Sequence, residues 1–243
     1  MAVLLEARGV TFRHPRQEGG ETGVEGVDLA VGTGEVVAVV GPSGGGKTTL
    51  VRLLAGLTRP DAGEVYLAGA PYGSLDLREV RRRVGLLFQV PHMLLGSVAD
   101  NITAAAGLAG EDPVAVEVDH WLAAVGLDAT LAGRAADRLS VGQQQRVALA
   151  RLLAMAPSCL LLDEPTAALD PASTSVVEAL LARLRDGGMG ILLVTHEIPL
   201  ARRLADRVVV LVDGRVVEEG RAAAVLTRPN HPATQTLLEE GTA

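Results

Sequence analysis

The stretch that decides the fold reads Gly41-Pro42-Ser43-Gly44-Gly45-Gly46-Lys47-Thr48. It has the pattern G-x-x-x-x-G-K-[ST], and it lies between an aliphatic run at 36–40 and a helical pattern at 47–57. We predict a buried strand before the stretch and a helix after it. Glycines let the backbone N–H groups of such a loop turn toward phosphate oxygens, and the helix N-terminus adds partial positive charge. The stretch therefore predicts a binding site for the phosphates of a nucleotide.

The polar residues at the end of this loop have separate predicted roles. The Lys47 ammonium is a point charge for the β- and γ-phosphates, and the Thr48 hydroxyl is a ligand for Mg²⁺. Thr49 completes the predicted nucleotide-binding residues of the loop. The alternative is a glycine-rich turn that binds nothing, and the strand and helix patterns beside the motif favour the phosphate site.

A second aliphatic run ends in two acidic residues and reads Cys159-Leu160-Leu161-Leu162-Asp163-Glu164. Asp163, at the end of a predicted strand, is expected beside Mg²⁺ and linked to it through water. Glu164 is expected to face the γ-phosphate, where a carboxylate orients and polarises an attacking water. An acidic pair that only caps a strand is the alternative, and the presence of the phosphate loop favours catalysis.

The composition excludes several classes of protein. The chain has 243 residues with 22 Lys and Arg against 29 Asp and Glu, so its net charge is −7 and no nucleic-acid partner is expected. Its single Cys excludes a disulfide framework and a multi-cysteine metal site. No apolar run approaches the ~20 residues of a membrane-spanning helix, and the N-terminus does not resemble a signal peptide. We expect a cytoplasmic chain that reaches a membrane only through a partner.

Short aliphatic runs alternate with helical patterns along most of the chain. This alternation predicts an α/β fold with a mostly parallel sheet, whose strands are expected at 36–40, 84–88, 159–162, 191–194 and 208–212. Antiparallel strands are expected at the edge of that sheet, near the N-terminus and at 64–67. The segment 15–23, rich in Gly, Glu and Gln, is expected to be a loop.

The middle of the chain has a different pattern. The segment 90–156 is rich in Ala and Leu and has no clear strand run, so we predict a helical insertion there. The chain is then a single domain, 1–243, whose α/β core consists of 1–89 and 157–243.

Part of the insertion reads Leu139-Ser140-Val141-Gly142-Gln143-Gln144-Gln145-Arg146. It resembles L-S-G-G-Q, the signature motif of ATP-binding cassette (ABC) ATPases, which many other phosphate-loop families lack. Further marks of that family follow in the expected order: Gln89 resembles the glutamine of the Q-loop, Asp170 that of the D-loop aspartate, and His196 the switch histidine. The resemblance covers essentially the whole chain. It implies a RecA-like P-loop NTPase core with an α-helical subdomain, in the ATP-binding subunit of a bacterial importer-type transporter.

The resemblance also implies how these residues act. Two chains, either two copies or one copy and a homologous ATPase subunit, close head to tail around two ATP molecules. The residues implied at the ATP of the opposite chain are Ser140, Gly142, Gln143 and Asp170. Within each site Glu164 acts on the attacking water and His196 holds Glu164 and the γ-phosphate in place. Gln89 contacts Mg²⁺.

Two positions depart from the family pattern. Val141 replaces the first Gly of the signature, so its side chain either points away from the nucleotide or sits in strained backbone with positive φ. His14 follows Phe12 in the predicted N-terminal strand, where many relatives have a Tyr or Trp that stacks on adenine. His14 is therefore either a small stacking platform or an ordinary surface histidine.

The stretch Gln89-Val90-Pro91-His92-Met93-Leu94-Leu95 combines a proline-broken loop with three consecutive apolar residues. Such residues are either buried or covered by a partner. The resemblance implies that a separate integral-membrane permease docks there, which would place the chain on the inner face of the membrane. For the basic run Arg81-Arg82-Arg83, a solvated helix face is favoured over a binding patch.

The function implied is ATP hydrolysis that powers solute transport through the permease. The alternative is a soluble, non-transport ABC ATPase of DNA repair, chromosome maintenance or translation, although such proteins usually carry tandem cassettes, coiled coils or metal-binding cysteines. A P-loop kinase or GTPase-like switch has no use for the signature motif. The solute and the direction of transport stay open.

Overall fold

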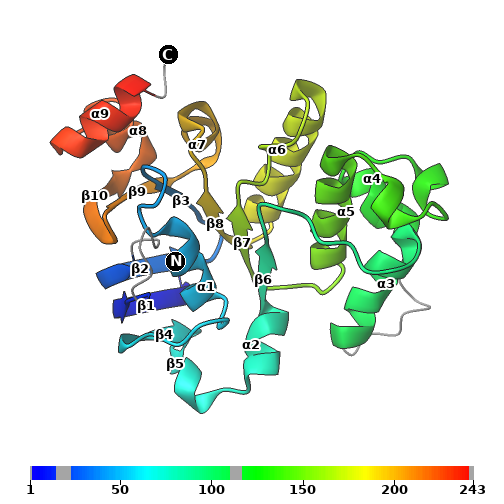
Figure 1. Cartoon of the computed structure of the whole chain (residues 1–243), viewed down its shortest axis with the longest axis horizontal. Helices are drawn as coiled ribbons and strands as arrows, with labels where there is room; N and C mark the ends of the chain where they lie inside the picture. The colour runs from blue at the N-terminus through cyan, green and yellow to red at the C-terminus, as the bar shows by residue number, and fades with distance from the viewer. Residues whose placement is uncertain (1, 15–22, 110–116, 241–243) are drawn as a thin grey trace.

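The computed structural model describes residues 2–14, 23–109 and 117–240, so the loop expected at 15–23 falls almost entirely outside the described residues. The larger of its two sheets has six strands in the order β10-β9-β3-β8-β7-β6 (Figure 1). These strands are β3 (Val36–Val40), β6 (Val84–Leu87), β7 (Cys159–Asp163), β8 (Gly190–Val194), β9 (Arg207–Val212) and β10 (Arg215–Arg221). Every neighbouring pair except β10 and β9 is parallel, which confirms the predicted α/β fold.

The N-terminal strands are antiparallel, as predicted, but they do not extend the edge of the parallel sheet. They form a second sheet in the order β2-β1-β4-β5, from β1 (Val3–Phe12), β2 (Val24–Gly32), β4 (Ala62–Leu67) and β5 (Ala70–Pro71). The physical reason is the helix α1 (Lys47–Leu54), whose Leu50, Leu53 and Leu54 pack in one cluster with side chains of both β1 and β3. The helix therefore separates the two sheets.

Helices cover both faces of the parallel sheet, so its central strands β3, β8 and β7 are almost entirely apolar. Val37 and Val39 face α1, whereas Val36 of the same strand packs with Leu160 and Leu162 against the opposite helices. The remaining elements of the core are α2 (Leu77–Arg83), α6 (Pro171–Asp186), α7 (Ile198–Leu204), α8 (Ala222–Val225), α9 (Pro232–Glu240) and the short 3₁₀ turn η1 (Tyr72–Ser74). No helix in the described ranges has both the length and the apolar character needed to cross a membrane.

The segment between β6 and β7 is helical, and in Figure 1 it lies to one side of both sheets. Its elements are α3 (Val98–Ala109), α4 (Val118–Ala124), η3 (Ala129–Leu131), η4 (Ala136–Arg138) and α5 (Val141–Leu153). We call this segment the helical subdomain. It packs onto the core mainly through α5, which contacts β6.

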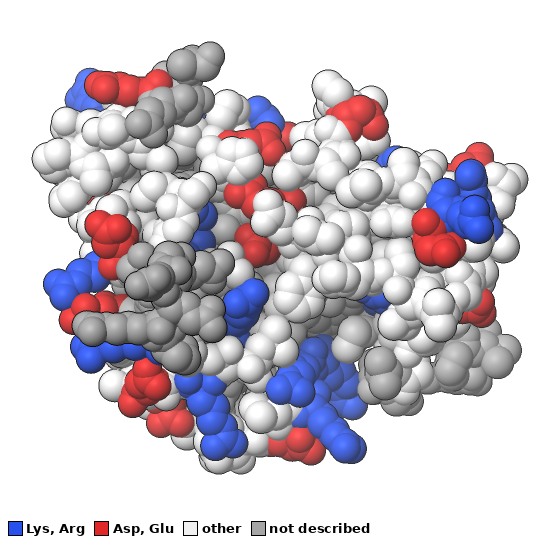
Figure 2. Space-filling view, in the orientation of Figure 1, with Lys and Arg blue, Asp and Glu red and all other residues white. Residues whose placement is uncertain are grey.

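The basic run at the end of α2 is partly engaged within the protein. Arg81 donates to the carbonyl of Gly56 at 3.0 Å, and Arg83 lies 3.7 Å from the carboxylate of Glu79. Figure 2 shows basic side chains over α2 with acidic ones beside them. These contacts favour the helix-face interpretation.

Candidate active site

Parallel strands bring the predicted site residues to one edge of the six-stranded sheet. The phosphate loop with Lys47 follows β3, Glu164 follows β7, and His196 lies two residues beyond β8. The strand predicted at 84–88 ends at Leu87, and Gln89 lies in the turn beyond it. Since β3, β8, β7 and β6 are neighbours with the same direction, their carboxyl ends all open at this catalytic edge.

The phosphate loop needs glycine for steric reasons. A Cβ on Gly41 would lie 2.0 Å from the carbonyl oxygen of Leu211, so only glycine lets the loop pass that strand. Gly46, which precedes the first residue of α1, has φ of +99°, a conformation that side chains oppose. The turn is closed by a hydrogen bond from the N–H of Gly45 to the carbonyl of Pro42 at 3.1 Å. Together these features leave a small hollow lined by Gly44, Gly46, Lys47, Thr48 and Thr49.

Lys47 folds back over this loop. Its Nζ donates to the carbonyl oxygens of Gly41 and Pro42, each at 2.8 Å. Burial lowers the pKa of Lys47, while the charges of Glu164 and Asp163 oppose that shift. The loop thus holds a partly desolvated cation near two carboxylates.

Asp163 and Glu164 are both largely buried, with exposed fractions of 7% and 6%. Burial raises the pKa of Asp163, the charge of Glu164 raises it further, and Lys47 and Arg52 oppose the rise. Burial and the nearby Glu164 thus disfavour the ionised form of Asp163, so a bound cation would relieve an existing electrostatic cost.

Glu164 is held in an unusual backbone conformation. Its φ is +49°, which is uncommon for a residue other than glycine and concentrates at functional sites. Its Oε1 accepts from the backbone N–H of His196 at 3.0 Å and lies 2.8 Å from the Nδ1 of that ring. Its Oε2 accepts from the Thr195 hydroxyl at 3.3 Å, the longest of the three contacts. The carboxylate is therefore fixed mainly through one oxygen.

Thr195 is a site residue that sequence reasoning missed. It is fully buried, and its hydroxyl contacts Glu164 and accepts from the N–H of Glu197 at 3.0 Å. Its only signal in the sequence is its place between an aliphatic run and His196, which does not distinguish it from an ordinary strand-end threonine.

The signature motif forms the start of α5. Ser140 precedes the helix, and its hydroxyl accepts from the N–H of Gln143 while the Gln143 side chain accepts from the N–H of Ser140, a reciprocal capping box. Val141 is the first helical residue, so its φ is not positive, and its side chain is 58% exposed. Of the two alternatives for Val141, the structure supports a side chain that points outward without strain.

Gly142 has an intramolecular packing role that the sequence did not reveal. A Cβ there would lie 2.7 Å from the carbonyl oxygen of Ala168, in the turn that leads to Asp170. This turn is held to the start of α6 by two hydrogen bonds: the Asp170 carboxylate accepts from the N–H of Ser173 at 2.9 Å and from its hydroxyl at 2.6 Å. These bonds lower the pKa of Asp170. The start of α5 and the start of α6 are thus packed together.

The chain does not bring its own signature motif to its own phosphate loop. In Figure 1, α1 and α5 lie on opposite sides of β6 and β7. Ser140, Gly142 and Gln143 therefore stand apart from Lys47, beside the Asp170 turn.

His14 lies at the start of α1. Its Nε2 is 2.9 Å from the hydroxyl of Thr49, and its ring meets the edge of Phe12 with centroids 5.0 Å apart. The ring is thus attached to the phosphate-loop helix, and adenine stacking on His14 stays a prediction.

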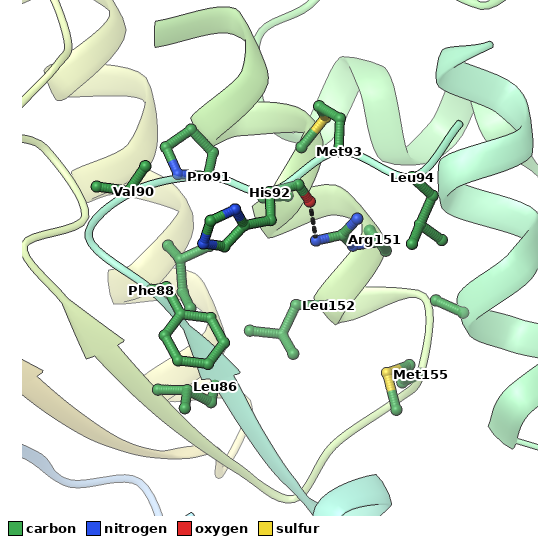
Figure 3. Close-up of a pocket in the computed structure, with 13 residues that line it drawn as sticks. Leu86, Phe88, Val90, Pro91, His92, Met93, Leu94, Arg151, Leu152 and Met155 are labelled. Atoms are coloured by element: carbon green, nitrogen blue, oxygen red, sulfur yellow. Dashed lines mark hydrogen bonds between the residues drawn. The ribbon is translucent and has the colours of Figure 1, made fainter. Parts of the chain in front are cut away.

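Residues 86–88 and 90–94 line a hollow of about 320 Å³ between β6 and α5, which we call the docking groove (Figure 3). Its walls are mostly apolar and include Phe88, Val90, Pro91, Met93, Leu152 and Met155. The Arg151 guanidinium donates to the carbonyl of His92 at 2.9 Å, which fixes the loop backbone.

The three consecutive apolar residues of the segment 89–95 have different surroundings. Met93 packs against the core, whereas Leu94 is 48% exposed and Leu95 is fully exposed. Asn101, itself fully buried, holds the backbone of Leu94 through hydrogen bonds of 2.8 and 3.1 Å. The expectation of internal packing is thus met by Met93 alone, and the outward leucines are presented on a fixed backbone.

Comparison with known proteins identifies a family model and a related sequence. The family model described as ABC transporter matches residues 24–167. The methionine import ATP-binding protein MetN of Caulobacter vibrioides is 46% identical over 226 residues, which cover 90% of this chain and 67% of MetN.

Two solved structures share the fold over most of their length. The cassette MJ0796, in a dimeric post-hydrolysis state bound to ADP and Pi, has a TM-score of 0.82 and 31% identity, covering 90% of this chain and 99% of that one. The protein cbiO1 from Clostridium perfringens, part of the transporter complex cbiONQ, has a TM-score of 0.78 and 28% identity, covering 94% and 92%.

Proposed function

This chain belongs to the ABC transporter family, and on that premise we propose how its residues bind ATP and couple its hydrolysis to a permease. The chain is an ATPase that acts as a dimer and powers transport through a separate membrane protein. The import function in the name of MetN supports import as the direction here as well. The permease holds the chain at the inner face of the membrane.

The observation that carries the proposal is the position of Lys47, which is folded over the phosphate loop beside Asp163 and Glu164. Phosphate oxygens replace the carbonyls of Gly41 and Pro42 as its partners when ATP binds. The loop N–H groups and the start of α1 bind the same phosphates. The remaining residues of the loop, Ser43, Gly44, Gly45, Gly46, Thr48 and Thr49, surround the phosphate chain, and His14 lies toward the base.

The residues at the catalytic edge fit Mg²⁺. Hard oxygen ligands suit this ion, which usually takes one or two carboxylates together with substrate phosphates and water. Thr48, Asp163 and Gln89 provide a hydroxyl, a buried carboxylate and an amide oxygen, and the raised pKa of Asp163 indicates a carboxylate that a cation would stabilise. The described residues contain no cluster of three or more His, Cys, Asp or Glu that would hold a metal by itself, as expected if ATP completes the ligand set. When bound, Mg²⁺ would neutralise phosphate charge.

Glu164 and His196 act on the attacking water. Glu164 Oε1 is fixed by the N–H and ring of His196, so Oε2, with its longer contact to Thr195, is the oxygen free to accept from water. The water attacks the γ-phosphorus, its proton moves toward Glu164, and ADP leaves. The Nδ1 side of the His196 ring contacts Glu164, which leaves Nε2 on the other side of the ring to contact the γ-phosphate.

A second ATPase subunit completes each site. Ser140, Gly142 and Gln143 form a helix N-terminus, which attracts anions, and they stand apart from the phosphate loop of their own chain. We assign them to the γ-phosphate of the opposite subunit, with Asp170 beside them. The outward Val141 side chain leaves this contact free.

The permease docks on the segment 89–95 and in the docking groove beside it. The exposed Leu94 and Leu95 form an apolar surface on a backbone held by Arg151 and Asn101. A short apolar segment of a membrane protein would cover these side chains. Gln89, at the start of the same segment, connects the docking groove to the catalytic edge.

The test uses Glu164→Gln, which keeps the size of the side chain but removes the carboxylate. We expect kcat to fall by about 10²-fold or more while ATP stays bound, so that light scattering detects a species of twice the 25.2 kDa chain mass with ATP and Mg²⁺. Lys47→Ala in the same variant is the control and should abolish the dimer. A Glu164→Gln chain that hydrolyses ATP at the wild-type rate would overturn the assignment of Glu164.

A further inference from the structure

A buried glutamine joins the helical subdomain to the core. Gln145 on α5 is only 2% exposed, and its Nε2 donates to the carbonyl of Phe88 at 3.2 Å. Its Oε1 is buried with no hydrogen-bond partner, one of two such side-chain atoms in the described ranges. Buried polar groups are normally satisfied, because an unpaired one costs stability. The half-satisfied amide therefore requires an explanation.

Gln145 lies between the signature helix α5 and the segment that follows β6. Gln145 lies one turn after Gly142 on the helix whose N-terminus we assign to the opposite ATP. Phe88 directly precedes Gln89 and lines the docking groove, as does Ala148, one turn further along α5. The single hydrogen bond of Gln145 thus links the signature helix to the segment that leads to both the catalytic edge and the groove.

A purely structural role explains the Nε2 of the Gln145 amide but not its Oε1. One donor satisfies the Phe88 carbonyl, and a smaller polar residue or a water would serve the same end. Gln145 Oε1 accepts no hydrogen bond in this conformation of the chain. It is therefore available to accept one in a second conformation. A two-state element needs a contact that differs between its states, and the orphan Oε1 provides one.

We propose that Gln145 is a positioning residue that transmits the movement of the signature helix to the segment 88–90. In the nucleotide-free chain its Nε2 holds the Phe88 carbonyl. When ATP draws α5 toward the opposite subunit, Oε1 accepts a backbone N–H of residues 89–90, which turns Gln89 toward the nucleotide and reshapes the groove. The inference rests on the proposed nucleotide site.

The test compares Gln145→Met with Gln144→Met. Methionine keeps the length of glutamine without its donor or acceptor. Gln144 is a matched control because its amide contacts the carbonyls of Ala136 and Asp137, at 3.3 Å each, which lie within the helical subdomain. We expect Gln145→Met to lower kcat about fivefold with KM for ATP within about twofold of wild type, and Gln144→Met to change neither.

Hydrogen exchange should detect protection of 88–91 by a non-hydrolysable ATP analogue in the wild type and in Gln144→Met, and its loss in Gln145→Met.

Three results would overturn the proposal. The first is a Gln145→Met variant with wild-type kcat and wild-type protection of 88–91. The second is an equal loss in both variants, which would make the effect general to the helix. The third is a wild-type chain in which the ATP analogue protects the first turn of α5 from hydrogen exchange without any change at 88–91. This result needs no variant, so it can be obtained even if Gln145→Met does not fold. A wild type that responds to the analogue in neither segment would instead refute the nucleotide site itself.

Discussion

The catalytic edge and the docking groove are built in opposite ways. At the edge, charged groups are buried and held by hydrogen bonds: Lys47 on loop carbonyls and Glu164 on His196. In the groove, the apolar residues Val90 and Leu94 are exposed, at 62% and 48%, and Leu95 beside the groove is fully exposed. Each arrangement is unfavourable in the isolated chain, the first through desolvated charge and the second through apolar surface in water. Both features therefore point to something that binds: a nucleotide at the edge and a protein in the groove.

The contrast also predicts that the two regions tolerate substitution differently. The edge depends on backbone positions that admit no extra atom, so small substitutions should be severe there. The groove depends on exposed side chains, so even a charge should leave the fold intact.

Of these substitutions, Gly41→Ala should change the protein most. It should disrupt the phosphate loop at the catalytic edge and leave the docking groove unchanged. The added methyl would meet the Leu211 carbonyl at 2.0 Å, so the loop must move. We expect a loss of about 1–3 kcal/mol in unfolding free energy and of about 10²-fold in ATP affinity, measured by thermal unfolding and nucleotide titration. Gly133→Ala, where a Cβ meets nothing within 4 Å, is the control. Wild-type ATP affinity in Gly41→Ala would contradict the steric argument.

Gly142→Ala separates the packing of the signature motif from its exposed neighbour. A methyl at 142 would lie 2.7 Å from the Ala168 carbonyl and push the start of α5 away from the Asp170 turn. We expect kcat to fall about tenfold. Val141→Gly, at an exposed position, should change kcat by less than about twofold. Steady-state ATPase assays measure both, and a Val141→Gly effect as large as that of Gly142→Ala would refute the outward orientation of Val141.

Charge in the groove should affect coupling alone. Leu94→Glu and Leu95→Glu place a carboxylate on an exposed apolar surface, so the fold and the basal ATPase should remain within about twofold of wild type. Permease-dependent stimulation of ATPase and transport should fall by about tenfold or more. Leu57→Glu is the matched control, because Leu57 is 45% exposed but does not line the groove. A parallel loss of basal ATPase would indicate a folding role for the leucines.

Asp163→Asn should produce the smallest change in stability, and it tests the electrostatics of the catalytic edge. The pKa of Asp163 is raised by burial and by Glu164, so the ionised carboxylate destabilises the folded, nucleotide-free chain above that pKa. Removing the charge should raise Tm by about 2 °C at neutral pH while impairing Mg²⁺-dependent hydrolysis. As the pH falls from the raised pKa toward the ordinary value of 3.8, Asp163 takes up a proton and the gain should disappear. A decrease in Tm at neutral pH would contradict the assigned cause of the shift.

Local patterns predicted the elements that position the site. The strands β3, β7 and β8 appear where aliphatic runs were found. Such runs are recognisable because a strand buried on both faces needs no alternation. Element ends were less accurate: the predicted helix 47–57 ends at Leu54, since the following turn contains Gly56 with φ of +64°.

The remaining findings depend on contacts between distant segments. The separate antiparallel sheet follows from the packing of α1 between β1 and β3. The contact between Gly142 and Ala168, and the bond from Gln145 to Phe88 across 57 positions, have no local pattern. They arise only when α5 packs beside β6 and α6.

The phosphate loop, the acidic pair at the end of β7 and the family could be recognised from the sequence alone. Each depends on short runs of neighbouring residues whose chemistry is local. The tertiary structure decided which groups meet: His196 on Glu164, Gly142 on Ala168 and Gln145 on Phe88. It also decided that Leu95 faces outward. The physical reason is that backbone propensity and hydrophobic pattern act over a few residues, whereas burial and hydrogen-bond partners are set only when the sheets and helices pack.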